Sequence, residues 1–190
     1  EKRGLEIRLC EDVRSYTNLI PALINYPHAV IISVDDDVIY PIDFVERLYR
    51  AYQKDSSKIY FYRGHYVLFD DNGKAQPYLE WVRHGAKGCD IYNFPTGVSG
   101  ILYPPHCYYE DMTNKELFLK LCPYADDVWF KAMTLLKGTL CEKIDTPHYE
   151  QLFVPVDIDE ETSLQHINVV NGGNDKQIDA VFRYYNIQNR

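Results

Sequence analysis

Three consecutive aspartates, Asp35, Asp36 and Asp37, follow an apolar, β-branched stretch in "AVIISVDDDVIYP" (29–41). Two carboxylates about 4 Å apart repel each other by roughly 4 kcal/mol at an effective dielectric constant near 20, so this cluster needs a compensating partner. Alternation along an extended chain places Asp35 and Asp37 on one side and Asp36 on the other. Because Mg²⁺ and Mn²⁺ bind carboxylates together with phosphate oxygens, we interpret Asp35 and Asp37 as metal ligands. The alternative is a capping cluster before a helix that starts at Pro41.

A second acidic pair, Asp126 and Asp127, stands at the start of a predicted helix. The helix dipole favours acids in a first turn, which is one interpretation of the pair. The other is a general base, a carboxylate held beside a reacting hydroxyl. Trp129 and Phe130 follow directly and could supply an apolar wall to such a site.

The segment "PTGVSGILYPP" (95–105) combines glycines with hydroxyl side chains. Gly97 and Gly100 allow the backbone to approach a ligand closely, and Thr96 and Ser99 offer hydroxyl groups. A plain turn explains the same residues equally well.

The late polar segment "HINVVNGGNDKQ" (166–177) offers two more candidates. His166 is either a third metal ligand or a structural histidine, and Lys176 could meet a diphosphate. Asn174 is most simply the cap of the last helix.

Composition sets limits on the class of protein. The 190 residues suffice for one domain, and the net charge of −8 with scattered basic residues argues against a nucleic-acid partner. No apolar run approaches the ~20 residues of a transmembrane segment, so we expect a cytoplasmic protein. The odd number of cysteines and the lack of a CxxC pair predict free, buried thiols at Cys10, Cys89, Cys107, Cys122 and Cys141.

The hydrophobic pattern predicts alternating helices and strands, and therefore an α/β fold. The strand at 29–34 is expected to be a central strand of the sheet, covered on both faces. Strands are also expected at 4–10, in an antiparallel meander over 58–82 with a turn at 70–74, after the glycine loop within 93–106, and at 139–144. Helices are expected at 15–27 with Ser15 as its cap, 41–55, 114–122, 125–138 closed by Gly138, and 174–187.

In this order the segments resemble the GT-A glycosyltransferases, close to family 2 and to bacterial enzymes that build surface polysaccharide. The resemblance covers residues 15 to about 186 and rests on "IISVDDDVIYP", "TGVSGILYPP", "YADDVWFK" and "NGGNDKQI". It implies a GT-A-like mixed sheet flanked by helices. Because only a short stretch precedes the aspartates, it also implies a single partial catalytic domain over 1–190 that lacks the N-terminal strands of the nucleotide-binding half. Within it, 1–57 would be the remnant of that half and 58–190 the acceptor-binding half.

The resemblance also implies roles for individual residues. In the family, the aspartates after the strand hold a divalent metal on the diphosphate of a nucleotide sugar, and an acid at a helix start deprotonates the acceptor hydroxyl. Asp127 matches that base, and Asp126 stands where family 2 usually has Glu. The remaining assignments are Asp35, Asp37 and His166 to the metal, Asp36 and Lys176 to the donor, and Thr96, Gly97, Ser99, Gly100 and Trp129 to the acceptor.

The implied activity is Mn²⁺- or Mg²⁺-dependent, inverting transfer of a sugar from a nucleotide sugar, with a UDP-sugar as the guess, to a glycan acceptor. It is compatible with peripheral association at the inner face of the membrane. Two alternatives remain open. A nucleotidyltransferase or metal-dependent phosphoester hydrolase also needs clustered carboxylates, and a non-catalytic carbohydrate-binding module could use the 17 tyrosines to stack on sugars.

Overall fold

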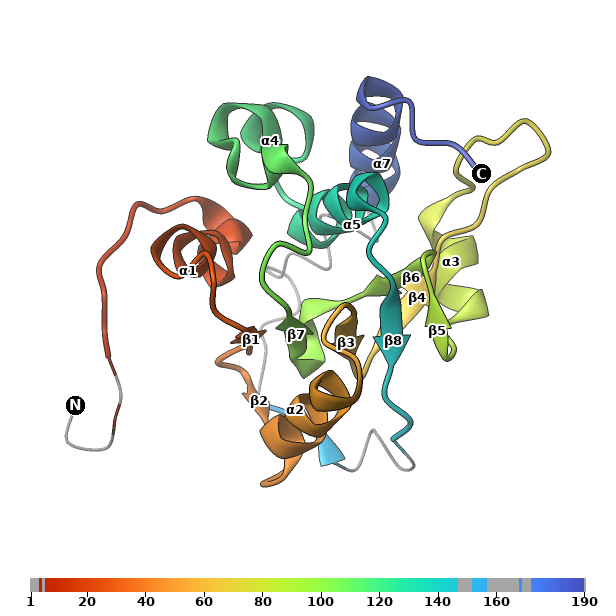
Figure 1. Ribbon diagram of the computed structural model, residues 1–190. Coiled ribbons are helices and arrows are strands. Elements are labelled where there is room, and N and C mark those ends of the chain that lie inside the picture. The colour runs from red at the N-terminus through yellow and green to blue at the C-terminus, as the bar shows by residue number, and fades with distance from the viewer. Residues whose placement is uncertain (1–3, 5, 147–151, 157–167, 169–171, 190) are drawn as a thin grey trace.

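A mixed five-stranded sheet forms the centre of the protein (Figure 1). The computed structural model describes residues 4, 6–146, 152–156, 168 and 172–189. Within them the strand order is β1 (Ile31–Ser33), β7 (Ile101–Tyr103), β3 (Ile59–Phe61), β8 (Cys141–Lys143) and β5 (Cys89–Asp90). β7 runs antiparallel to both β1 and β3, β3 runs parallel to β8, and β5 runs antiparallel to β8. The predicted α/β class is therefore confirmed.

Two small antiparallel pairs and several helices surround this sheet. The pairs are β2 (Val38–Ile39) with β9 (Val154–Pro155), and β4 (Gly64–Tyr66) with β6 (Asn93–Pro95). The α-helices are α1 (Ile20–Asn25), α2 (Phe44–Lys54), α3 (Tyr78–His84), α4 (Lys115–Leu121), α5 (Asp126–Lys137) and α7 (Gly173–Tyr184). Short 3-10 helices are η1 (Arg14–Asn18), η2 (Gly97–Ser99) and η3 (Glu110–Thr113).

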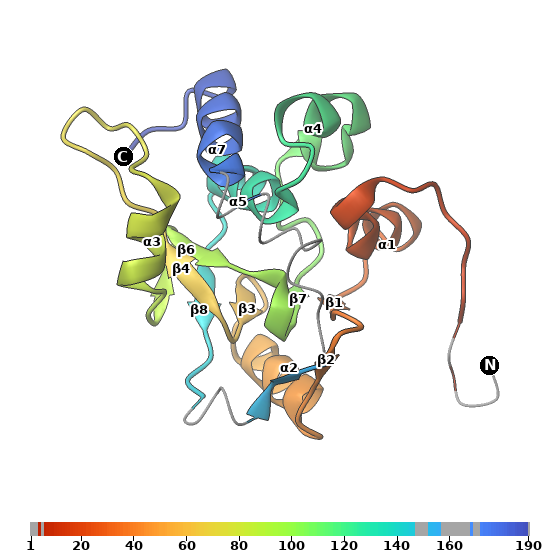
Figure 2. The same cartoon turned by 180° about the vertical axis from the view of Figure 1, so that it is seen from behind.

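Side-chain alternation along the central strands creates two apolar layers. Phe61 and Ile101 belong to the larger core cluster, which includes buried residues of α5 and α7. Tyr60 and Leu102 belong to a smaller cluster with Phe44 of α2. Figures 1 and 2 show α2 on one side of the sheet and α5 and α7 on the other. Both faces of the central strands are therefore covered, as their run of buried apolar residues requires.

β1 departs from the predicted central strand. Among the described residues its sheet partner is β7, which places it at the edge of the sheet. Ile31 and Ile32 are only half-buried, whereas Ser33 is buried. The predicted central position is therefore wrong. Both faces are nevertheless partly covered, because Ile31 packs against the larger core cluster and Ile32 against the smaller one.

The predicted helix at 15–27 is divided into η1 and α1. Pro21 lies at the beginning of α1, where its missing N–H costs no hydrogen bond, so a new helix starts there. Ser15 lies inside η1 and does not cap a helix. The strand predicted at 4–10 is also absent from the described residues 4 and 6–10.

The predicted meander over 58–82 is wrong in two respects. β3 and β4 belong to different sheets, and the last expected strand is the helix α3. Tyr78 and Trp81 are buried three residues apart on α3, and the Asp175 carboxylate accepts the Tyr78 backbone N–H at 2.7 Å. Asp175 thus caps α3 from a distant part of the chain, because the first backbone N–H groups of a helix have no acceptor within the helix.

Other predictions held in part. The helices at 114–122 and 125–138 are α4 and α5, and Gly138 is the left-handed C-cap of α5. Asn174 is wrong as a cap, because it is buried inside α7 and Gly172 takes that position. All five cysteines are free, but Cys10 and Cys89 are exposed rather than buried.

Within the part of the chain that the structure describes, no helix has the length and apolarity to cross a bilayer.

Gly100 is a packing requirement between β1, β7 and α2. Its φ is +80°, and a Cβ there would lie 2.9 Å from Phe44 Cε2 and 3.3 Å from the Ser33 carbonyl oxygen. Only glycine allows this approach. Gly100 therefore has a structural role, whereas the acceptor contact predicted for it stays a prediction.

Replacing Gly100 by alanine should destabilise the fold by more than backbone strain alone. The matched control is Gly85→Ala, because Gly85 has φ +61° and ψ 149°, Gly100 has φ +80° and ψ 135°, and a Cβ at Gly85 meets no atom within 4 Å. We expect Gly85→Ala to cost about 1–3 kcal/mol and Gly100→Ala at least ~1 kcal/mol more, measured by urea unfolding. Equal losses for the two variants would contradict the packing argument.

Candidate functional site

The three aspartates occupy a turn between β1 and β2. Asp35 and Asp37 are half-buried and Asp36 is exposed, so burial separates Asp36 from the other two. The Asn18 side-chain amide of η1 donates a hydrogen bond to Asp35 Oδ1 at 2.9 Å. The Asp35 backbone N–H donates to the Tyr40 hydroxyl at 2.8 Å. Hydrogen bonds to Asn18 and Tyr40 therefore hold both the side chain and the backbone of Asp35 in place.

Tyr40 also connects the aspartate turn to the glycine loop. Its hydroxyl donates to the Val98 carbonyl of η2 at 3.5 Å, a long hydrogen bond. Since Gly100 lets β7 begin close to the end of β1, η2 lies beside Asp35. The tight packing at Gly100 thus determines where Gly97 lies.

The start of α5 is held from two sides. Tyr16 of η1 donates its hydroxyl to the Cys122 carbonyl at 2.5 Å, and the Cys122 thiol donates to the Ala125 carbonyl at 2.9 Å. From the other side, Gln177 of α7 accepts the Tyr124 backbone N–H at 2.8 Å. These contacts position Asp126 and Asp127 in the first turn of α5.

The two acidic motifs meet at Gly97. A Cβ on Gly97 would lie 3.7 Å from Asp127 Oδ1 and 4.0 Å from Asp35 Oδ1, so these two carboxylates flank the same small volume. Gly97 is thereby a candidate contact residue, as the sequence predicted. The structure brings together Asp35, Gly97 and Asp127, which come from three separate sequence motifs.

Burial and mutual repulsion change the acidity of these carboxylates. Burial, and then Asp37, raises the pKa of Asp35. Burial chiefly raises the pKa of Asp126 to about 6, with Asp35 contributing to the rise. Burial, followed by repulsion from Asp126, holds the pKa of Asp127 well above its usual range. The cluster therefore favours bound protons or a cation.

Polar neighbours offset only part of the rise in the pKa values of Asp126 and Asp127. Ser15 of η1 faces Asp126 without a hydrogen bond of regular geometry, and its hydroxyl lowers the pKa of that acid. The nearby Gly97 backbone N–H and the Arg63 guanidinium lower that of Asp127. Arg63 is exposed and donates to the Thr96 hydroxyl at 3.2 Å. The Arg63 guanidinium thus bonds to the glycine loop.

The residues fit a divalent cation in part. Asp37 Oδ1 is buried and has no hydrogen-bond partner among the described residues, which leaves a carboxylate oxygen available to a ligand. Carboxylate oxygens are the donors that Mg²⁺ and Mn²⁺ prefer. However, no group of three His, Cys, Asp or Glu residues in the described chain is arranged to hold a metal. Asp35 and Asp37 could supply two ligands, and the others must come from substrate or water.

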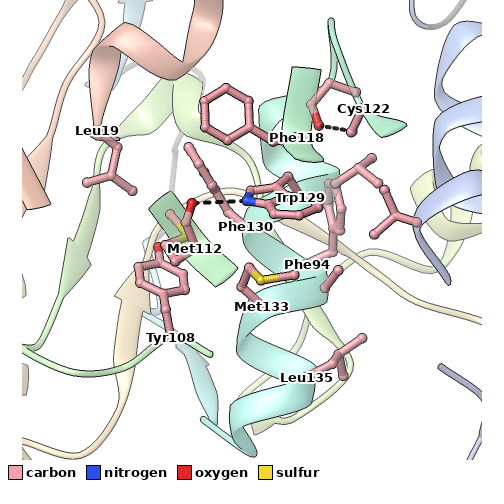
Figure 3. Packing of buried hydrophobic residues seen from close by; sticks show 14 of the residues in the cluster. Leu19, Phe94, Tyr108, Met112, Phe118, Cys122, Trp129, Phe130, Met133 and Leu135 are labelled. Carbon is pink, nitrogen blue, oxygen red and sulfur yellow. Dashed lines mark hydrogen bonds between the residues drawn. The ribbon is translucent and has the colours of Figure 1, made fainter. Parts of the chain in front are cut away.

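Several predicted acceptor contacts are wrong because their side chains are buried. Trp129 has no exposed surface, donates its indole N–H to the Met112 carbonyl at 3.1 Å, and packs in the core (Figure 3). Ser99 is fully buried, and Thr96 is 5% exposed with its hydroxyl bonded to Arg63. Residue type suggested these contacts, whereas packing against neighbouring elements buries the three side chains.

The donor-side predictions on the late segment are not brought to this site. His166 lies outside the described residues. Lys176 is exposed in the first turn of α7, and the structure gives it no contact with the acids. A cavity of about 710 Å³ lies elsewhere, lined by Asp70, Phe182 and other residues of the 70–77 segment, α7 and the C-terminal stretch. It includes none of Asp35, Asp126 or Asp127.

Sequence reasoning missed the residues that support the acids. Asn18, Ser15 and Tyr40 contact or face them from η1 and from the chain beyond the aspartate turn. The spacing of Ser15 and Asn18 in "RSYTN" was the available signal, since residues three apart share a face of a 3-10 helix. The signal was taken for a helix cap.

Replacing Asp126 by asparagine should stabilise the protein at neutral pH. The raised pKa of Asp126, about 6 against 3.8, contributes stability below about pH 4 that is lost as the pH rises toward 6. Asparagine avoids that loss, so we expect a gain of about 1–3 kcal/mol at pH 7 and much less at pH 4, measured by urea unfolding. Asp36→Asn is the control, because it removes an equal charge from an exposed side chain. The same gain at both pH values would contradict the assignment.

Comparison with known proteins finds no matching protein-family model and no significantly similar curated protein. The argument about function therefore rests on the geometry and chemistry of this site.

Proposed function

We propose that this protein is a metal-dependent glycosyltransferase that transfers a sugar from a nucleotide sugar to a glycan acceptor. The observation that carries the proposal is that Asp35 and Asp127 flank the same small volume beside Gly97. A nucleotide sugar brings a diphosphate that needs a cation and an anomeric carbon that needs an activated hydroxyl. The two acidic motifs could serve these two needs side by side.

The Asp126–Asp127 pair can provide the base. Two interacting buried carboxylates lose their protons in separate steps, so near neutral pH one can accept a proton while the other retains one. The ionised member would remove the proton from the acceptor hydroxyl as its oxygen attacks the anomeric carbon. The resemblance to the GT-A enzymes favours Asp127 for this role, and Asp126 is the other candidate.

Asp35 and Asp37 would hold the cation on the opposite side. When bound, Mg²⁺ or Mn²⁺ would neutralise charge on the departing nucleoside diphosphate. The chain's own contribution is to keep Asp35 in place through Asn18 and Tyr40. Asp36, being exposed, remains available to the ribose or sugar of the donor.

Gly97→Ala should separate binding from stability. Gly97 does not have a positive φ, and its nearest neighbours lie at ordinary van der Waals distances, so alanine should change the free energy of unfolding by less than ~0.5 kcal/mol. The new methyl group would enter the volume between Asp35 and Asp127. We expect transfer from UDP-linked sugars, followed as UDP release with a glycan acceptor, to fall at least tenfold. Full activity in Gly97→Ala would exclude this volume as the reaction site.

Variants of the acids assign their roles. Asp35→Asn and Asp37→Asn should abolish the Mn²⁺ dependence of UDP binding in calorimetry. Asp126→Asn and Asp127→Asn should retain Mn²⁺–UDP binding, and the one that removes the base should lower kcat by roughly 10²–10⁴. Asp71→Asn is the matched control, because Asp71 is an exposed acid in the distant 70–74 turn.

Products decide between the proposal and its alternatives. Release of inorganic phosphate without an acceptor would indicate a phosphoester hydrolase, and nucleotide-sugar formation from a nucleoside triphosphate would indicate a nucleotidyltransferase. Glycan binding that needs neither Mn²⁺ nor a nucleotide, with no turnover, would indicate a carbohydrate-binding module. Each of these results would overturn glycosyl transfer.

A further inference from the structure

Two exposed histidines face each other at the end of the sheet remote from the carboxylates. His28 Nδ1 and His106 Nε2 are 3.1 Å apart, and the ring centroids are 5.1 Å apart at an interplanar angle of 55°. His28 lies in the loop between α1 and β1, and His106 in the turn after β7. At this distance one ring nitrogen donates a hydrogen bond to the other, and the tautomers determine which ring is the donor. A metal ion bound by both nitrogens would take the place of the shared proton.

The pairing of β1 with β7 explains why these residues meet. Ile31 is paired with Tyr103 in antiparallel register. His28 lies three residues before Ile31 and His106 three residues after Tyr103, so the same antiparallel register places the two histidines opposite each other. Two prolines, at 104 and 105, stop the hydrogen-bonded ladder before it reaches the histidines. The imidazoles are therefore held opposite each other by the strands, although they lie on loops.

The backbone of His106 carries a second sign of constraint. Its φ is +61°, a left-handed conformation that non-glycine residues adopt only at a cost. Such strain persists only where the surrounding structure imposes it. Here the outcome of the conformation is an imidazole that reaches His28.

We propose that His28 and His106 form a binding site for a transition-metal dication, with Cu²⁺ bound more tightly than Ni²⁺ or Zn²⁺. Imidazole nitrogens bound to one such ion at about 2.0–2.1 Å lie roughly 2.9–3.4 Å apart, a range that contains the observed separation. The preference for Cu²⁺ follows from the general order of affinity for nitrogen ligands. Because no third His, Cys, Asp or Glu among the described residues joins the pair, water completes the coordination.

This site is chemically distinct from the carboxylate site. Its ligands are imidazole nitrogens, whereas Asp35 and Asp37 offer oxygen atoms suited to Mg²⁺ or Mn²⁺. It lies beyond the beginning of β1, whereas the aspartates follow the end of that strand. A metal bound here would join the α1–β1 loop to the turn after β7 and raise stability by mass action.

Calorimetric titration with Cu²⁺ near pH 7.5 in a non-coordinating buffer tests the proposal. We expect His28→Ala and His106→Asn to weaken Cu²⁺ binding at least tenfold; asparagine is chosen because it tolerates a positive φ. His84→Ala is the matched control, since His84 is an exposed histidine on α3 whose ring bonds the Glu80 backbone carbonyl. It should bind Cu²⁺ as the unchanged protein does.

Two further measurements make the result decisive. Pulsed EPR of the Cu²⁺ complex should show two bound imidazoles in the unchanged protein and fewer in both variants. Cu²⁺ should raise the unfolding temperature of the unchanged protein and of Asp35→Asn, but not of the two histidine variants, whose folding is checked in the presence of EDTA. Undiminished affinity in His28→Ala and His106→Asn, or a binding loss caused by Asp35→Asn, would overturn the site.

Discussion

The repulsion among Asp35, Asp126 and Asp127 is the constraint on which the account of the site depends. Burial and proximity raise the pKa of each of these acids, so the fold holds the carboxylates together at a cost. Packing elsewhere must supply that free energy, and it comes from apolar layers on both faces of the central strands. Such clusters are found where a protein needs protons or cations at one place.

The elements that keep the acids together come from distant parts of the chain. η1 contributes Asn18 to Asp35 and fixes the segment before α5 through Tyr16. α7 contributes Gln177 to the same segment, and Tyr40 links the aspartate turn with η2. The geometry of the site therefore depends on elements throughout the described fold. η1 is as necessary to it as the aspartate turn.

The sequence allowed the prediction of elements whose pattern is local. α2, α4 and α5 follow from apolar periodicity, and Gly138 from its position after the last periodic residue. α3 was mistaken for a strand because its start depends on Asp175, which is distant in sequence. Among the candidate residues, Asp35 and Gly97 were chosen from residue type and spacing, and the structure places them close together, while their roles stay predictions. Trp129 could not be excluded, since its burial depends on contacts with η3 that no local pattern records.

The most direct test of the account is an NMR titration of the Asp126 side-chain carboxyl carbon in the unchanged protein and in Asp35→Asn. If the two acidic motifs form one coupled site, the pKa of Asp126 should lie near 6 and should fall when the Asp35 charge is removed. A pKa of Asp126 near 3.8 in the unchanged protein, or one that Asp35→Asn leaves unaltered, would show that the carboxylates do not act together.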